Sequence, residues 1–215
     1  MTDWEKPRQE MVNQQLRRRG IRDPRVLEAM GKTPRHEFVH PHDRHIAYSD
    51  EPLPIAAGQT ISQPYMVAAM VEALRLTGVE RVLEVGAGSG YHAAVLAELA
   101  AEVITIEREP ALVRIARGNL ERTGYDRVRV VQGDGSLGYA AGAPFQAISV
   151  AAGAPEVPAR LLEQLDEGGR LVIPVGSLVD QELRLVLRTP EGFKTRVVNY
   201  CRFVPLRGAM AWRIQ

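Results

Sequence analysis

From residue 65 onward, the sequence alternates between stretches with helical periodicity and short runs of consecutive apolar residues. Helices are expected at residues 65–76, 91–101, 111–123 and 157–165, and strands at 81–85, 103–107, 128–131, 145–150 and 170–175. These strands are continuously apolar, which is typical of a parallel sheet that is covered by helices on both faces. The pattern therefore predicts an α/β fold with a doubly wound, mostly parallel sheet.

The two ends of the chain differ from this pattern. Residues 182–188 and 194–203 are separated by a Pro-Glu-Gly turn instead of a helix, so we expect an antiparallel strand pair at the sheet edge. Residues 1–53 are polar and helix-like, and residues 54–64 are an uncharged run of mostly small residues. We expect a single domain of residues 1–215, made of an N-terminal helical extension (1–53), a functional loop (54–64) and an α/β core with the C-terminal strand pair (65–215).

Charge and cysteine content argue against several classes of protein. Lys and Arg number 27 and Asp and Glu 26, a net charge of +1, which gives no support to nucleic acid or an anionic membrane as the main partner. We interpret the run Arg17, Arg18, Arg19 as a solvated helix end. The single cysteine, Cys201, excludes an internal disulfide and is typical of a reducing compartment. With no signal-like or membrane-length apolar stretch and no coiled-coil repeat, we expect a cytoplasmic protein that is a monomer.

A glycine-rich turn follows the first expected strand, in residues 81–90, and contains Gly86, Gly88 and Gly90. Glycine allows positive φ in such a turn and close approach of a ligand to the backbone. Alone, the turn is also compatible with a tight connection that binds nothing. However, Glu107 ends the next strand, and a Gly-Asp-Gly sequence at 133–135 follows the third. Because these features meet at the carboxyl edge of a parallel sheet, they together indicate a nucleotide-like ligand, with Glu107 placed to receive a ribose diol.

The spacing of the glycines helps to choose the ligand. A dinucleotide site has the pattern Gly-x-Gly-x-x-Gly, whereas here the third glycine comes one residue early and Tyr91 occupies its place. There is no Walker-type Gly-Lys-Ser/Thr sequence either. S-adenosylmethionine has no phosphate and needs only backbone groups near the glycine turn. It therefore fits this pattern better than NAD.

Residues 53–65, Leu-Pro-Ile-Ala-Ala-Gly-Gln-Thr-Ile-Ser-Gln-Pro-Tyr, resemble the signature loop of the protein-L-isoaspartate O-methyltransferase family, in which the methyltransferase glycine motif follows. The resemblance extends over nearly the whole chain in the family's order. Further matches are Arg35 with Phe38 and Val39, residues 133–135, Gln164 with Leu165, Gly168 with Gly169, residues 174–176 and residues 203–206. The Gly-Gln-Thr-Ile-Ser-Gln-Pro sequence is specific to the family, whereas the glycine motif is common to many methyltransferases with Rossmann-like folds.

The resemblance implies transfer of a methyl group from S-adenosyl-L-methionine to the carboxylate of L-isoaspartyl residues in damaged proteins, which initiates their repair. It places Ser62 where the isoaspartyl carboxylate meets the methyl donor, with Thr60 and Ile61 beside it. The cofactor-binding residues that it implies are Glu84, Gly86, Ala87, Gly88, Glu107, Asp134 and Gly135. No metal is implied.

Four positions depart from the family pattern. Ala56 stands where glycine is usual, Ala87 where threonine is common, His92 where glutamine is frequent and Gln146 where aspartate is usual. They leave two alternatives open: a methyltransferase of the same fold that acts on a small molecule, and a cofactor-binding homologue with reduced activity. A dehydrogenase that binds NAD is disfavoured by Tyr91.

Methyl transfer to the isoaspartyl carboxylate requires alignment of the carboxylate with the methyl group more than it requires proton transfer. The reason is that an isoaspartyl carboxyl group is already ionised near neutral pH. Positioning and removal of water accelerate such a reaction. We therefore expect Ser62 to orient the carboxylate by a hydrogen bond and not to act as a nucleophile. The alternative is a structural hydroxyl that satisfies the loop backbone.

Two other groups of residues were considered as reactive sites. His36, His40, His42 and His45 lie in one short segment, but their spacing matches no standard metal site, so surface histidines are expected. Cys201 lies in an apolar run and is interpreted as a buried small side chain without reactivity. No Gly-x-Ser-x-Gly sequence of a hydrolase is present.

Overall fold

The computed structural model describes residues 3–212, which contain a seven-stranded sheet in the order β5-β4-β3-β6-β7-β8-β9. The strands are β3 (Arg81–Val85), β4 (Glu102–Glu107), β5 (Arg129–Gln132), β6 (Phe145–Val150), β7 (Leu165–Gly176), β8 (Gln181–Thr189) and β9 (Gly192–Cys201). Neighbours from β5 to β7 are parallel, while β8 and β9 are antiparallel to the strands before them. The predicted mostly parallel sheet with a C-terminal antiparallel pair is confirmed, and β9 forms its edge.

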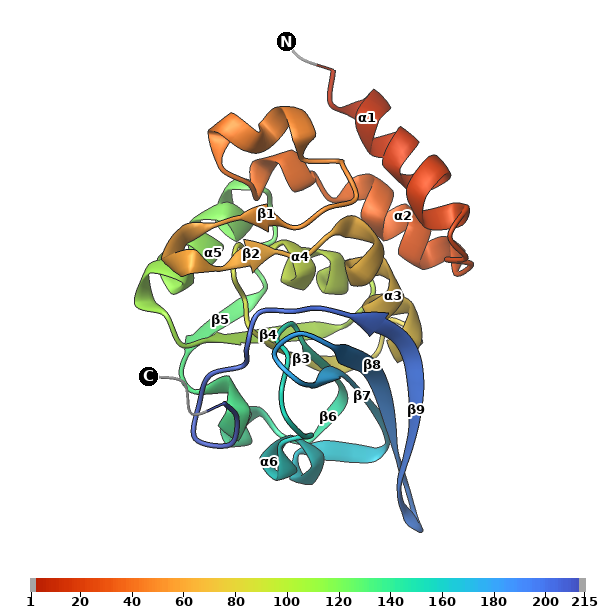
Figure 1. Cartoon of the computed structure of the whole chain (residues 1–215), viewed down its shortest axis with the longest axis vertical. Helices are drawn as coiled ribbons and strands as arrows, with labels where there is room; N and C mark the ends of the chain where they lie inside the picture. Colours follow the sequence, from red (N-terminus) through yellow and green to blue (C-terminus); the bar gives the residue numbers. More distant parts are fainter. Residues whose placement is uncertain (1–2, 213–215) are drawn as a thin grey trace.

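Helices cover both faces of this sheet (Figure 1). The main helices of the core are α3 (Pro64–Leu74), α4 (Tyr91–Ala97), α5 (Pro110–Arg122) and α6 (Ala159–Glu163). Alternate residues of β3 belong to two separate apolar cores: Val82 packs with residues of α3, α4 and α5, while Leu83 and Val85 pack with α6. This division explains why β3 carries apolar side chains on both faces, although it also contains the exposed Arg81 and the buried Glu84. Within residues 3–212, no helix is both long and apolar enough to cross a membrane.

The N-terminal extension is helical, as predicted. Helix α1 (Glu5–Glu10) continues into the π-helix η1 (Met11–Arg17), and α2 (Pro24–Lys32) follows with Asp23 as its N-cap. The 3-10 helices η2 (Arg35–Glu37) and η3 (Pro41–Ile46) complete it. The buried apolar residues of the extension, Leu16 and Met30 among them, belong to the same core as α3 and α4. The division of the chain into one domain with three parts stays a prediction.

The expected functional loop contains regular structure. Strands β1 (Leu53–Pro54) and β2 (Thr60–Ile61) form a short antiparallel pair, in which Leu53 is opposite Ile61. The 3-10 turn η4 (Ala56–Gly58) joins them, with Ala57 in the left-handed region at φ 58°. Figure 1 shows this hairpin between the N-terminal extension and the sheet. The two residue pairs of this hairpin bring the two ends of the loop together.

Two boundaries differ from the prediction by more than two residues, because of contacts with distant parts of the chain. Helix α4 ends at Ala97 instead of residue 101, because the carbonyl of Glu80 accepts the N–H groups of Ala101 and Glu102 and starts β4. Strand β7 begins at Leu165 instead of residue 170, because Leu165 pairs with Phe145 before an irregular stretch restores the register at Arg170. Helix α6 is correspondingly shorter than the predicted helix.

Candidate active site

The glycine turn between β3 and α4 requires glycine at several positions. Gly86, Gly88 and Gly90 have φ values of 94°, 53° and 90°, which residues with a side chain rarely adopt. At Gly90 a Cβ atom would also lie 3.1 Å from the side chain of Leu120 and 3.3 Å from the carbonyl oxygen of Ala116. The turn therefore packs closely against α5 and presents its backbone at the carboxyl edge of the sheet.

A cleft opens above this turn. Its walls are the glycine turn with the start of α4, the end of β4 at 106–109, the loop residues 59–62 and a C-terminal segment at 204–207. The space between them, including the open mouth, is about 840 Å³. The structure thus brings together the glycine turn, Glu107 and the loop residues that the sequence indicated, and it adds residues such as Leu112, Ala151 and 204–207, which the sequence did not indicate.

Glu107 is a largely buried carboxylate in the wall of the cleft. Its oxygens accept the N–H groups of Gly88 at 3.1 Å and Glu109 at 3.0 Å. These bonds fix the carboxylate between the glycine turn and the end of β4, with its position set by the parallel pairing of β3 and β4. An acid held in this way can accept hydrogen bonds from the two hydroxyls of a ribose.

Across the cleft lie Thr60, Ile61 and Ser62. Ile61 is buried and anchors the hairpin, whereas Thr60 is exposed and Ser62 is half-buried. Neither hydroxyl is hydrogen-bonded to another of residues 3–212. The loop also touches the glycine turn, since a Cβ atom on Gly88 would lie 3.3 Å from Cδ1 of Ile55. Unpaired hydroxyls thus face the backbone turn and Glu107 across one cleft.

The whole chain, including this cleft, matches one family of proteins. The family model of "Protein-L-isoaspartate(D-aspartate) O-methyltransferase (PCMT)" matches residues 6–211. The chain belongs to this protein-L-isoaspartate O-methyltransferase family. It is 53% identical over 212 residues to protein-L-isoaspartate O-methyltransferase 1 of Syntrophobacter fumaroxidans, covering 99% of each chain. It is 55% identical over 207 residues to protein-L-isoaspartate O-methyltransferase 2 of Marinobacter nauticus, covering 95% of this chain and 94% of that one.

Solved structures agree with the family. One is a Plasmodium falciparum protein assigned to the protein-L-isoaspartate O-methyltransferases, in complex with S-adenosyl-L-homocysteine. It superposes with a TM-score of 0.79 at 27% identity over 93% of this chain and 98% of that one. Another protein-L-isoaspartate O-methyltransferase gives a TM-score of 0.82 at 30% identity over 94% of this chain and 67% of that one. The predicted family and methyltransferase fold are confirmed.

Two of the residues that the family resemblance implied for the cofactor do not reach the cleft. The side chain of Glu84 is fully buried and accepts a hydrogen bond from the hydroxyl of Thr105. The carboxylate of Asp134 accepts the N–H and hydroxyl of Ser136 at 3.0 and 2.7 Å and the N–H of Ala209 at 2.8 Å. The side chains of Glu84 and Asp134 therefore do not line the cleft, because one points into the helix-covered core and the other holds the C-terminal segment; cofactor binding by these residues stays a prediction.

The remaining cofactor candidates of the family line the cleft: Gly86, Ala87, Gly88, Glu107 and Gly135. At Gly135 a Cβ atom would lie 2.5 Å from Cγ1 of Val85 and 3.3 Å from Cγ2 of Ile106. A side chain there would displace the end of β3. Glycine at this position is thus required by packing beneath the cleft.

The four departures from the family pattern divide into two groups. Ala87 and His92 line the cleft. Gln146 lies at the start of β6, where it accepts the N–H of Arg81 at 2.9 Å and donates to Asp166 at 2.7 Å. Ala56 is exposed in η4 and is not part of the wall. Only the first two departures therefore bear directly on the site.

Residues 202–207, here named the strap, follow β9 and cross the carboxyl edge of the sheet. Gln181 holds the strap by accepting the N–H of Phe203 at 2.8 Å and donating to its carbonyl at 3.2 Å. The carbonyl of Gly153 accepts the N–H of Leu206 at 2.7 Å. The matching sequence at 203–206 indicated the family but gave no role, because nothing local shows that this segment returns to the cleft.

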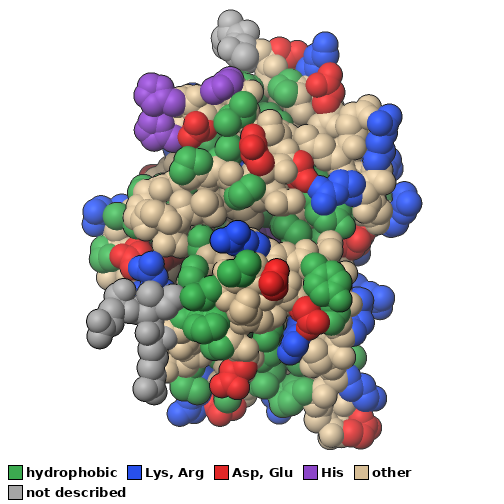
Figure 2. Space-filling model, in the orientation of Figure 1, with side chains coloured by type: hydrophobic (Ala, Val, Ile, Leu, Met, Phe, Trp, Pro, Cys, Tyr) green, Lys and Arg blue, Asp and Glu red, His purple; other side chains and the backbone are tan. Residues whose placement is uncertain are grey.

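The histidine segment corrects one expectation. His40, His42 and His45 are exposed, and Figure 2 shows histidine side chains gathered at one corner of the N-terminal extension. His36 was expected at the surface but is buried, stacked on Trp4 and with Nδ1 at 2.7 Å from the hydroxyl of Tyr48. Among residues 3–212, no group of three or more His, Cys, Asp or Glu residues could hold a metal ion.

Cys201 and the arginine run also have defined places. Cys201 is half-buried instead of buried, and burial raises the pKa of its thiol to about 12, which keeps it protonated. Arg17, Arg18 and Arg19 are exposed at the end of η1, as predicted.

Proposed function

We propose that the cleft transfers a methyl group from S-adenosyl-L-methionine to the side-chain carboxylate of L-isoaspartyl residues in damaged proteins, and so initiates their repair. The chain is an S-adenosylmethionine-dependent protein carboxyl O-methyltransferase, as its curated relatives are at about half identity over nearly the full length. One observation carries the assignment of the site. The free hydroxyls of Thr60 and Ser62 lie across one cleft from the glycine turn and Glu107.

The residues of the cleft fit this cofactor. Gly88 lines the cleft without a side chain, and a Cβ atom there would lie 3.3 Å from Cδ1 of Ile55 in the loop. Apolar side chains of Ile106, Leu112 and Leu206 can enclose an adenine ring, and Glu107 can accept the ribose hydroxyls. No cradle of backbone and lysine for a pyrophosphate is formed by this wall. The glycine turn and Glu107 thus suit the amino-acid end and the ribose of this cofactor.

We assign cofactor contacts to Gly86, Ala87, Gly88, Glu107 and Gly135, and a supporting position to Glu84 and Asp134. Their hydrogen bonds keep β3, β4 and the C-terminal segment in place behind the wall. When bound, the cofactor supplies an electrophilic methyl group on its sulfonium.

Ser62 is assigned the task of orienting the substrate carboxylate. Its hydroxyl can donate one hydrogen bond to an oxygen of the carboxylate and leave the other oxygen free to react. Thr60 offers a second hydroxyl at the mouth, and Ile61 fixes the backbone between them. No general base is needed, because the carboxylate is ionised near neutral pH. The enclosed walls replace water around the nucleophile, which favours the aligned geometry.

The partners follow from the same proposal. Isoaspartyl-containing proteins and peptides are the substrates. A net charge of +1 supports the absence of a nucleic-acid partner. The single cysteine supports a cytoplasmic location, and we propose a monomer as the working state.

Transfer of a labelled methyl group to paired peptides tests the function. The two peptides share one sequence and differ only in an L-isoaspartyl or a normal aspartyl residue. We expect base-labile label on the isoaspartyl peptide alone. Equal labelling of both peptides, or labelling of small carboxylic acids but neither peptide, would contradict the proposal.

A further inference from the structure

The loop that carries Thr60 and Ser62 is tied at its base by Asp50. One carboxylate oxygen of Asp50 accepts the backbone N–H of Tyr65 at 2.9 Å, and the other accepts Nε2 of Gln63 at 3.4 Å. Gln63 is the N-cap residue of α3 but makes no capping bond of its own. Asp50 therefore caps the first turn of α3 from outside the helix. Because Asp50 precedes the β1–β2 hairpin and Tyr65 follows it, this contact closes the loop at its neck.

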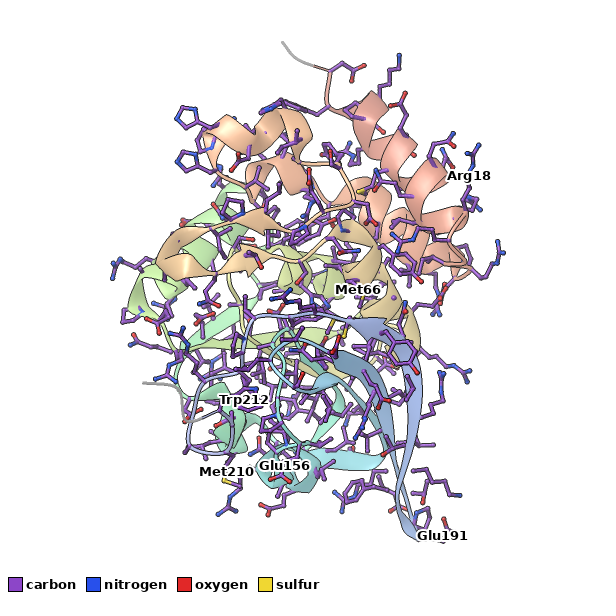
Figure 3. The ribbon with its side chains drawn as sticks, in the orientation of Figure 1. Arg18, Met66, Glu156, Glu191, Met210 and Trp212 are labelled. Carbon is purple, nitrogen blue, oxygen red and sulfur yellow. The ribbon has the colours of Figure 1, made fainter. Side chains whose placement is uncertain are left out.

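Arg19 adds a third contact to this neck. Its guanidinium forms an ion pair with the carboxylate of Asp50, and its central carbon lies 3.6 Å from the centroid of the Tyr65 ring. Arg18, one residue earlier, forms no ion pair with any of residues 3–212, and Figure 3 shows its side chain pointing away from the body of the protein. One arginine of the exposed run is thus directed to the loop base, while its neighbour faces solvent.

Tyr65 connects the neck to β9, the strand that leads into the strap. Its hydroxyl accepts a hydrogen bond from Nδ2 of Asn199 at 3.1 Å. Asn199 lies near the end of β9, three residues before the strap, whose residues 204–207 line the cleft. A continuous series of contacts therefore runs from Arg19 through Asp50 and Tyr65 to Asn199, and it joins the base of the loop to the strand that precedes the strap.

We propose that Arg19, Asp50 and Tyr65 are positioning residues that hold Ser62 at its reacting distance from the cofactor. The inference rests on the function proposed above for its effect on turnover. The two-residue strands β1 and β2 are too short to fix the loop alone. Closing the loop at its base removes conformations that would otherwise move the hydroxyl away from the substrate carboxylate. None of the three side chains contributes to the glycine turn or to Glu107, so cofactor binding does not depend on them.

Four variants test the neck: Asp50→Ala, Asp50→Asn, Arg19→Ala and the matched control Arg18→Ala. Turnover of the isoaspartyl peptide is compared with the affinity and stoichiometry of cofactor binding by calorimetry. Amide hydrogen exchange of residues 53–63 reports the loop itself. Asp50→Ala should lower kcat roughly tenfold or more, the effect of losing hydrogen bonds to a charged group. Cofactor affinity and stoichiometry should match the wild type.

The conservative variant Asp50→Asn and the control Arg18→Ala allow the turnover of the variants to be ranked. Asparagine at position 50 keeps an acceptor for the N–H of Tyr65 but loses the charge for Arg19, so Asp50→Asn should fall between the wild type and Asp50→Ala. Arg19→Ala should resemble Asp50→Asn, and Arg18→Ala should resemble the wild type. Exchange in residues 53–63 should be roughly tenfold faster in Asp50→Ala and unchanged in Arg18→Ala.

The outcomes separate this inference from the proposed function. Wild-type protein without transfer to the isoaspartyl peptide would contradict the function, and the exchange measurements would then still decide whether the neck orders the loop. An active wild type with unchanged turnover and exchange in Asp50→Ala and Arg19→Ala would overturn the inference. A fall in cofactor stoichiometry that parallels the loss of turnover would indicate general misfolding and would also overturn it. Should Asp50→Ala fail to fold, Arg19→Ala at the exposed end of η1 provides the same test.

Discussion

Nδ1 of His92 lies 3.7 Å from Oε1 of Glu84, and among residues 3–212 neither atom has a hydrogen-bond partner. Burial raises the pKa of Glu84 to about 8 and lowers the pKa of His92 to about 4. Between these values both side chains are uncharged. The pair beneath the glycine turn is therefore largely uncharged at physiological pH, and the ionisable acidic and basic side chains of the cleft wall are Glu107, Arg108, Glu109 and Arg207.

Replacement of Glu84 by glutamine should change how stability depends on pH. The pKa of Glu84 in the folded protein, about 8, is above the value of 4.5 for a free side chain. The contribution of Glu84 to the free energy of unfolding is therefore fully present below pH 4.5 and is lost as the pH rises towards 8. Glu84→Gln cannot ionise, and its free energy of unfolding should fall less between pH 5 and 9, by a difference on the order of a few kcal/mol. Urea unfolding at pH 5, 7 and 9 measures this. Glu156→Gln, at an exposed position labelled in Figure 3, is the control and should follow the wild type.

Replacement of His92 by glutamine should change how stability depends on pH below neutrality. The pKa of His92 in the folded protein, about 4, is below the value of 6.5 for a free side chain. The contribution of the neutral His92 to the free energy of unfolding is therefore fully present above pH 6.5 and is lost as the pH falls towards 4. His92→Gln should lose less stability than the wild type between pH 7 and 4, and should remain active because glutamine is frequent there in the family. Melting temperatures across this range are the measurement. An identical acid slope in the wild type and His92→Gln would show that His92 is not buried as a neutral side chain; exposed His42→Gln is the control.

Glu107→Ala should weaken cofactor binding by about 1–3 kcal/mol, the range for losing hydrogen bonds to a charged group. The reason is that Glu107 is the acid fixed in the wall between the glycine turn and β4. Calorimetry with S-adenosyl-L-homocysteine measures the loss without turnover. Glu102→Ala removes an exposed acid at the opposite end of the same strand and should bind normally. Unchanged affinity in Glu107→Ala would remove this residue from the site.

Ser62→Ala should keep cofactor binding and lower turnover roughly tenfold to a few hundredfold, equivalent to about 1.5–3 kcal/mol for one charge-assisted hydrogen bond. Ser62→Thr should retain more activity than alanine if the loop accommodates the methyl group. Steady-state transfer to the isoaspartyl peptide measures both variants. A covalent role would instead abolish turnover in both and leave a methylated serine, detectable by mass spectrometry in the wild type. Wild-type rates in Ser62→Ala would restore the interpretation as a structural hydroxyl.

The sequence predicted the sheet because each element has its own local pattern. Residues 81–85 and 145–150 were predicted with the observed bounds, since both are predominantly apolar runs between turn-forming residues. The glycine turn, Glu107 and the loop hydroxyls were found for a similar reason: each follows directly on a recognisable strand or motif. The boundaries of α4 and β7 were missed, because the carbonyl of Glu80 and the strand partner of Leu165 come from distant parts of the chain.

By itself, the sequence determined the order of helices and strands, the family and the segments that meet at the carboxyl edge of the sheet. These follow from residue periodicity and from contiguous motifs. Only the tertiary structure decided which side chains face the cleft. Glu84 points into the core with Val82, on the face of β3 covered by α3, α4 and α5, and Asp134 turns to the C-terminal segment. The contact of Arg19, Asp50 and Tyr65 was likewise set by the fold, because these residues are 31 and 15 positions apart and no local pattern joins them.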